Sequence, residues 1–233
     1  MANLARGNVR RTLKDIKAWH TSQEIFRLIT AKSWPYKTDL EFYRARDKAL
    51  MAIDFVGGFR NNEPLLYKTV FENGETKREI NSQALRRSNF ENTNSWLILK
   101  EAKISKRSAK LIAKYGSRIT TRETILFPKY QHPLQPFTDL ILDYILSFLD
   151  IADEPLFKFG ERRHHQIVYY VTGEWPHWLR SMGENWYGHN VWRNDPVSLA
   201  KFVGVVNVQS VMAYVGFDEE SYRERLKSAT DRK

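Results

Sequence analysis

The chain has no cysteine among its 233 residues. This absence excludes a disulfide scaffold, a thiol nucleophile and any metal or iron–sulfur site with cysteine ligands. No apolar run approaches the ~18 residues of a membrane-spanning helix, and the basic segment Met1 to Arg11 lacks the apolar stretch of a signal peptide. Repeats and low-complexity linkers are absent too, while 42% apolar residues suffice for a core. We therefore expect a soluble cytoplasmic protein with no membrane partner.

Positive charge is in excess, with 37 Lys and Arg against 27 Asp and Glu and a net charge of +10. Such a protein attracts polyanions, because each Lys or Arg that neutralises a phosphate releases a counterion. The charge is clustered near the N-terminus, over residues 100–114 and over residues 162–165, which favours nucleic acid as partner over a role in solubility alone. The candidate DNA-contacting residues are Lys100, Lys106, Arg107, Lys110, Arg162 and Arg163.

Helical periodicity covers most of the chain. Residues 38–57 repeat apolar side chains at helical spacing after Thr38 or Asp39 as cap, and Gly57-Gly58 ends the pattern. Thr21 and Glu24 have the spacing of a capping box before a short helix. Further helices are predicted over 137–149, 163–183, 197–203 and 207–214.

Strand signals are confined to the middle of the chain. Residues 95–99 and 123–127 predict two strands, residues 60–72 predict a helix or turn, and residues 155–159 predict irregular chain. The predicted fold is therefore mainly α with a small antiparallel sheet inserted after the second helix.

The adjacent pair His164-His165 predicts a basic surface or a DNA contact rather than a metal site. Neighbouring residues do not share a helix face, and no carboxylate accompanies them at ligand spacing. We expect no metal and no other cofactor.

Four short pieces of sequence contain reactive residue types in a fixed order. They are Gly58-Phe-Arg60-Asn-Asn-Glu63, the lysine-rich segment between the two predicted strands, His177-Trp-Leu-Arg180, and the run from Gly204 to Tyr214. Each piece alone is weak evidence, since Arg60 suits a solvated helix end and His177 or Tyr214 suits core packing. Their joint occurrence is more specific.

This ordered set resembles the tyrosine recombinase (phage integrase) family. That family has an Arg-x-x-Glu box, a lysine on a β-hairpin, a His-x-x-Arg box and a tyrosine ten residues after a glycine, as Tyr214 follows Gly204 here. The run Asn207-Val-x-x-Val-Met-x-Tyr214 is similar to the corresponding stretch of Cre recombinase. The resemblance covers roughly residues 40–217 and implies the integrase catalytic-domain fold.

The resemblance implies metal-free DNA cleavage. Arg60 and Arg180 would hold the non-bridging oxygens of a phosphorane-like transition state, because guanidinium groups bind them bidentately and stay charged. Tyr214 would attack phosphorus, aided by His177, since a phenol with a reference pKa of ~10 is a poor nucleophile unaided. Glu63 would be structural, as an orienting partner for an arginine.

Two positions leave alternatives open. The lysine that protonates the leaving 5′-oxygen is Lys103 in our first interpretation, with Lys106 next and Lys100 last. Val205 stands where the family has His or Trp, and valine cannot donate a hydrogen bond. Either His189, Trp186 or Trp192 substitutes for it, or the enzyme is slower, or the protein is a degenerate copy.

The expected organisation has three parts. Residues 1–37 form a basic arm or small helices, residues 38–217 the catalytic domain, and residues 218–233 a charged tail that packs on a neighbouring protomer. The 37 residues before residue 38 are too few for the DNA-clamping domain usual in the family. We predict a site-specific recombinase forming a 3′-phosphotyrosine, tetrameric on double-stranded DNA in the nucleoid or on host-cell DNA. The alternatives are a type IB topoisomerase-like enzyme and a DNA-binding relative without catalysis.

Overall fold

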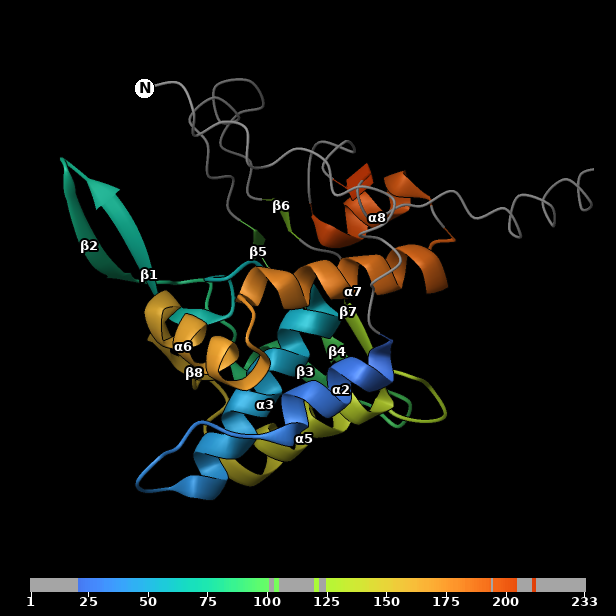
Figure 1. Cartoon of the computed structure of the whole chain (residues 1–233), viewed down its shortest axis with the longest axis horizontal. Coiled ribbons are helices and arrows are strands. Elements are labelled where there is room, and N and C mark those ends of the chain that lie inside the picture. Colours follow the sequence, from blue (N-terminus) through green and yellow to red (C-terminus); the bar gives the residue numbers. More distant parts are fainter. Residues whose placement is uncertain are drawn as a thin grey trace, which may run out of the picture.

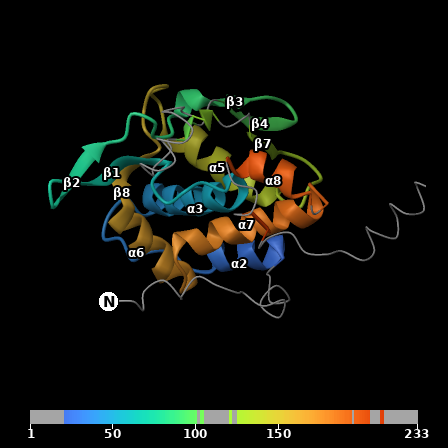
Figure 2. The same cartoon turned by 90° about the horizontal axis from the view of Figure 1, so that it is seen from above.

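The computed structural model describes residues 21–100, 125–193, 195–204 and 211–212, together with the backbone of residues 103–104 and 120–121. Helices dominate the body (Figure 1), and most of the strands lie at its edges when it is seen from above (Figure 2). The helices are α2 (Ser22–Ala31), α3 (Leu40–Gly57), α5 (Gln135–Phe148), α6 (Glu161–Thr172), α7 (Pro176–Asn190) and α8 (Pro196–Val203), with a short 3-10 helix at Arg87–Asn89. The strands are β1 (Leu65–Glu72), β2 (Glu75–Ile80), β3 (Phe90–Asn92), β4 (Trp96–Leu99), β5 (Lys103–Ile104), β6 (Thr120–Thr121), β7 (Ile125–Pro128) and β8 (Phe157–Gly160).

Helix α3 is the centre of the molecule, as the sequence periodicity of residues 38–57 predicts. From Arg46 to its end nearly every residue is buried, because α5 packs along the helix and α7 crosses its C-terminal end (Figures 1 and 2). Gly58 ends the helix with a left-handed backbone at φ 56°, a conformation that glycine adopts readily. Asp39 precedes the helix but makes no side-chain cap hydrogen bond.

Helix α2 packs on the same core. The predicted capping box is confirmed, since Thr21 accepts from the Glu24 backbone and Glu24 accepts in return from the Thr21 backbone at 2.7 Å. Ile25 and Ile29, one turn apart on one face, are fully buried in the hydrophobic cluster that α3 and α5 share. The small helix expected before residue 38 is therefore part of the main body.

In the described part of the chain the strands form three small sheets rather than the single inserted sheet predicted. Their orders are β2-β1-β8, β3-β4-β7 and β5-β6, and the β1–β8 pairing is parallel. Predicted strands 95–99 and 123–127 are confirmed in β4 and β7.

Two strand regions were predicted wrongly. Residues 60–72, expected as a helix or turn, contain β1, because Asn73 and Gly74 both have positive φ and make a two-residue hairpin turn. Residues 155–159, expected to be irregular, contain most of β8, which gains its ladder from β1, far away in sequence. The β1–β2 hairpin projects from the body (Figure 2).

The later helices correct one prediction and confirm two. The predicted helix 163–183 is two helices, because Gly173 turns left-handed at φ 77° and Pro176 starts α7. The predictions for 137–149 and 197–203 are confirmed as α5 and α8. Most of the predicted helix 207–214 lies outside the described residues. No helix in the described part of the chain has the length and apolarity to cross a bilayer.

Candidate functional site

Arg60 lies in a tight turn directly after α3. Glu63 closes this turn, since its Oε2 accepts from the Arg60 backbone N–H at 2.6 Å and its Oε1 lies 3.4 Å from Arg60 Nη1. The Glu63 backbone N–H donates in turn to the Arg60 carbonyl at 2.9 Å. The carboxylate thus restricts both the backbone and the half-buried side chain of Arg60.

Asn81, which follows β2, holds the same turn from another side. Its Nδ2 lies 3.1 Å from the carbonyl oxygen of Asn62 and 3.0 Å from that of Leu65. Asn81 was not predicted as a site residue, because a side chain that donates to backbone carbonyls leaves no sequence motif. No local signal marked it either, since no strand was predicted over residues 75–80.

A buried carboxylate–histidine pair joins three elements beneath the turn. His164 Nε2 of α6 lies 2.6 Å from Asp54 Oδ2 of α3, and His164 Nδ1 lies 2.9 Å from the Asn61 carbonyl oxygen. Both side chains are at most 1% exposed. The expectation that His164 belongs to a basic surface is therefore wrong, since the tertiary partner Asp54 draws it into the interior.

The surroundings of this pair raise the pKa of both Asp54 and His164. Burial raises the pKa of Asp54, although the charges of His164 and Arg180 oppose that shift. Burial alone would lower the pKa of His164, but the charge and hydrogen bond of Asp54, the Asn61 carbonyl and the charge of Glu161 together outweigh burial, and the pKa is raised. Because Glu63 and Arg180 both act on Asp54, the turn after α3 and the start of α7 share one electrostatic neighbourhood.

Helix α7 contributes His177 and Arg180 from its first turns. Three residues apart, they lie on one side of the helix, with His177 exposed and Arg180 4% exposed. Arg180 Nε donates to Glu184 Oε1 at 2.5 Å, and Arg180 Nη1 is buried without a hydrogen-bond partner in the described part of the protein. One donor of Arg180 is thus uncommitted there. Close contact of α7 with α3 at Gly183 sets this placement, since a Cβ there would lie 1.8 Å from the Phe55 carbonyl oxygen.

The remaining predicted site residues lie in several places. Lys103 is in β5, antiparallel to β6, while Lys100 is exposed and pairs with Glu91. Gly204 caps α8 with φ 72°, as a left-handed glycine. His189 is in the last turn of α7, about 18 Å along the axis from His177 at the standard rise per residue. Outside the described residues lie Lys106, Arg107, Lys110, Val205 and Tyr214.

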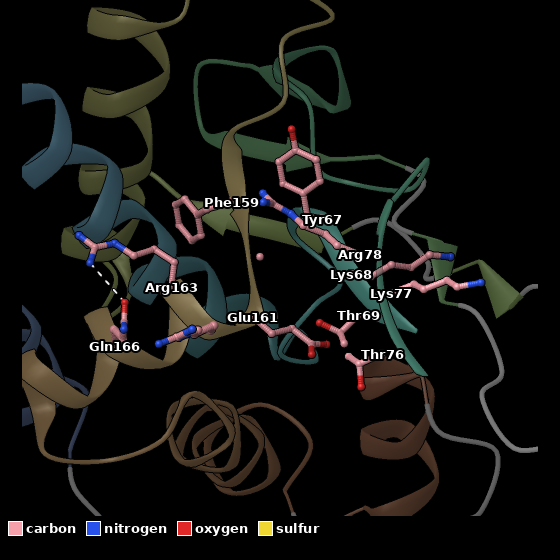
Figure 3. Close-up of a pocket in the computed structure, with 12 residues that line it drawn as sticks. Tyr67, Lys68, Thr69, Thr76, Lys77, Arg78, Phe159, Glu161, Arg163 and Gln166 are labelled. Atoms are coloured by element: carbon pink, nitrogen blue, oxygen red, sulfur yellow. Dashed lines mark hydrogen bonds between the residues drawn. The ribbon is translucent and has the colours of Figure 1, made fainter. Parts of the chain in front are cut away.

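A shallow hollow lies between the β1–β2 hairpin and the start of α6 (Figure 3). It encloses about 370 Å³ and is lined by Lys68, Lys77, Arg78, Arg162 and Arg163, with Glu161 as the acidic member. Arg163 is committed, because its guanidinium stacks 4.2 Å over the Trp34 ring. Arg162 is exposed, and Lys68 and Lys77 make exposed ion pairs with Glu79 and Glu72. Among the described residues no group of three metal-binding side chains occurs.

No family model matches the chain, and no curated protein matches it. Solved structures do match in fold, among them two of XerH site-specific recombinase, one bound to difH substrate before cleavage and the other to palindromic difH substrate after cleavage. The fold is similar to that of XerH. For the pre-cleavage complex the TM-score is 0.51 at 14% identity, with 91% of this chain and 52% of the XerH chain covered. The post-cleavage complex gives 0.51 at 14% identity, with 88% and 50% covered.

The chain thus spans about half the length of the XerH chains, as covered fractions of 52% and 50% show. The likeness to XerH covers 91% of the present chain in the pre-cleavage complex and 88% in the post-cleavage complex. It establishes the fold.

Proposed function

We propose that this chain cleaves and rejoins DNA as a site-specific recombinase, without metal or ATP. The observation that carries the proposal is that Glu63 fixes Arg60 after the end of α3 and Glu184 fixes buried Arg180 on α7, a helix packed against α3, in a fold similar to that of a site-specific recombinase. Arginines held at fixed positions suit a reaction in which negative charge builds up on phosphate oxygens. The +10 net charge suits a DNA partner.

The two arginines are held differently, and both arrangements suit phosphate binding. Glu63 orients Arg60 at the surface, whereas Glu184 occupies one edge of buried Arg180 and leaves Nη1 unpartnered in the described part. A non-bridging phosphate oxygen would satisfy that donor. Guanidinium groups suit this role because they stay charged at all working pH values.

The proposed reaction proceeds by in-line displacement at phosphorus. The Tyr214 oxygen forms the new bond to phosphorus while the bond to the 5′-oxygen breaks, giving a 3′-phosphotyrosine. His177, exposed at the start of α7, takes the phenolic proton, and Lys103 on the β5–β6 pair gives a proton to the leaving 5′-oxygen. Rejoining is the reverse, with the 5′-hydroxyl as nucleophile, so no external energy source is needed.

A nicked suicide duplex tests this proposal, because loss of the short leaving strand traps the adduct. Wild type and Tyr214→Phe are incubated, without metal, with duplexes tiled across the DNA that flanks the protein's own gene. We expect a covalent protein–DNA band on a denaturing gel for wild type and none for Tyr214→Phe. A band of equal intensity from both proteins would contradict the role of Tyr214.

The second candidate is a DNA-binding protein without cleavage, and Val205 favours it. Valine cannot supply the phosphate hydrogen bond that the family's His or Trp supplies. In that case no duplex gives an adduct, and salt-sensitive DNA binding persists. Val205→His restores a donor at this position. Weak wild-type adduct that increases in the variant indicates a slow enzyme, whereas no adduct from either protein indicates a DNA-binding protein without cleavage.

Assembly on DNA is part of the proposal. Recombination needs two duplexes, so we propose a tetramer in which residues 218–233 contact a neighbouring protomer. Mass photometry of the protein with its cleaved duplex measures this directly, and a truncation after residue 217 should reduce the tetramer to smaller complexes. A monomer that relaxes supercoiled plasmid would instead indicate the topoisomerase-like alternative.

A further inference from the structure

Buried side chains from elsewhere in the chain hold the turn that carries Arg60, because they form hydrogen bonds with its backbone carbonyls. The carbonyls of Asn62, Glu63 and Leu65 face Asn81 Nδ2, and the carbonyl of Asn61 faces His164 Nδ1. Of these two donor residues, His164 belongs to α6, which leads directly into α7. It therefore links the Arg60 turn to the helices that bear the other candidate site residues.

The hydrogen-bond roles of His164 follow from its partners. A carbonyl oxygen only accepts, so Nδ1 facing Asn61 must be protonated. Nε2 then shares a proton with Asp54 across 2.6 Å, either as imidazolium with carboxylate or as imidazole with carboxylic acid. Both ring nitrogens are engaged in either form, which fixes the ring orientation completely.

Asp54 extends this link toward Arg180. Its Oδ2 is bound to His164, whereas its Oδ1 is buried without a partner in the described part, as is Arg180 Nη1. The Arg180 charge lowers the pKa of Asp54, so the two groups lie within electrostatic range. Asp54 thus bonds to the histidine that anchors the Arg60 turn and interacts electrostatically with Arg180.

We propose that Asp54 and His164 are positioning residues that hold the Arg60 turn in register with α7, so that both arginines address one phosphate. This inference rests on the proposed function for its chemical consequence. Its structural part, the tethering of the turn by His164, stands independently. Neither residue touches DNA, since both are buried beneath the turn.

Two amide substitutions at His164 separate the two hydrogen bonds. In His164→Asn the amide nitrogen occupies roughly the place of Nδ1 and keeps the bond to the Asn61 carbonyl. In His164→Gln the amide nitrogen reaches the place of Nε2 and keeps the contact with Asp54, while the turn loses its donor. If the turn is what matters, His164→Gln is the more damaging variant.

Single-turnover cleavage of a suicide duplex supplies the functional measurement. We expect His164→Gln to slow adduct formation roughly 10- to 100-fold, as misplacement of a catalytic group by about 1 Å does, with unchanged DNA affinity. His164→Asn should be slowed less. A core variant of α5, Ile141→Val, serves as the control for stability, and it should cleave at the wild-type rate.

Hydrogen exchange of the amides of residues 57–65 supplies a measurement that needs no activity. We expect these amides to exchange faster in His164→Gln than in His164→Asn or Ile141→Val when the variants are compared at the same temperature difference below each one's thermal midpoint. If wild type forms no adduct but exchange shows this order, the proposed function fails and the tethering of the turn stands. If wild type cleaves and both His164 variants cleave and exchange like Ile141→Val, the positioning role is overturned and the proposed function stands.

Discussion

The Arg60 turn and the β1–β2 hairpin follow one another in the chain, yet they are held in opposite ways. Buried side chains of Asn81 and His164 bind the carbonyls of the turn, and Glu63 closes it. In the hairpin all six residues of β2 are exposed, and Lys68 and Lys77 pair with exposed glutamates at 3.5 to 3.6 Å. The hairpin thus carries exposed positive charges, whereas the turn and α7 hold their arginines in fixed positions.

This difference shows why clustered charge alone does not locate a site. Exposed pairs such as Lys68–Glu79 contribute about 0 to 1 kcal/mol to stability and hold no fixed geometry. Arg180 and Glu184, at 5% and 3% side-chain exposure, form a buried pair whose members cannot be removed singly without cost. The following variants test the contrast.

Glu184→Met is expected to have the largest effect. It leaves the Arg180 guanidinium buried without its carboxylate, which costs about 3 to 5 kcal/mol of unfolding free energy. Urea denaturation measures the loss. A loss of unfolding free energy below about 1 kcal/mol, the range of exposed ion pairs, would show that the buried pair and the hairpin pairs do not differ in strength.

Gly183→Ala is expected to cost about 3 kcal/mol, because an added Cβ would lie 1.8 Å from the Phe55 carbonyl oxygen and force α7 away from α3. Gly160→Ala is the matched control, with its Cβ 3.3 Å from the Tyr67 carbonyl oxygen, and should be much milder. Both are measured by urea denaturation. Equal losses would show that α3 and α7 separate easily, contrary to a rigid junction.

The protonation of His164 predicts that the free energy of unfolding depends on pH. Its pKa is raised above 6.5 in the folded protein, so its stabilisation is complete below that pH and is lost as pH rises through the folded pKa. The pKa of Asp54 is also raised, from its ordinary 3.8, so its contribution to stability is likewise lost as pH rises.

The measurement compares wild type with His164→Gln over pH 6 to 9 by urea denaturation. Other histidines, such as His165 with its lowered pKa, titrate in both proteins and cancel. The wild-type advantage should shrink as pH rises. An advantage that grows with pH would contradict the assigned direction.

The hairpin variant Glu79→Met is expected to have the smallest effect, within about 1 kcal/mol, because its partner Lys68 remains solvated. It is the surface counterpart of Glu184→Met in the same denaturation series. A loss comparable to that of Glu184→Met would mean that the hairpin is held as firmly as the junction.

Sequence patterns predicted the parts of the fold that depend on local periodicity. Helices α3, α5 and α8, the Thr21–Glu24 capping box and strands β4 and β7 all carry such a signal. The sequence patterns did not predict β8, because its pairing partner β1 is distant in the chain. They did not predict β1 either, because the turn signal at Asn73-Gly74 is short.

The site shows the same division. The Arg-x-x-Glu and His-x-x-Arg boxes were visible as motifs, and the geometry places Glu63 on Arg60 and Glu184 on Arg180. The roles of Asp54, His164 and Asn81 were not visible, because each depends on a partner brought near only by the fold. Residues that position a site through tertiary contacts are therefore harder to predict from sequence than the motif residues that they position.

The most direct test of the account is the chemical identity of the trapped adduct. Peptide mapping by mass spectrometry of a suicide-duplex adduct, after nuclease digestion, locates the attached nucleotide. We expect a 3′-phosphate joined to the phenolic oxygen of Tyr214. A nucleotide on another residue, or DNA bound at low salt with no covalent product on any duplex, would contradict it.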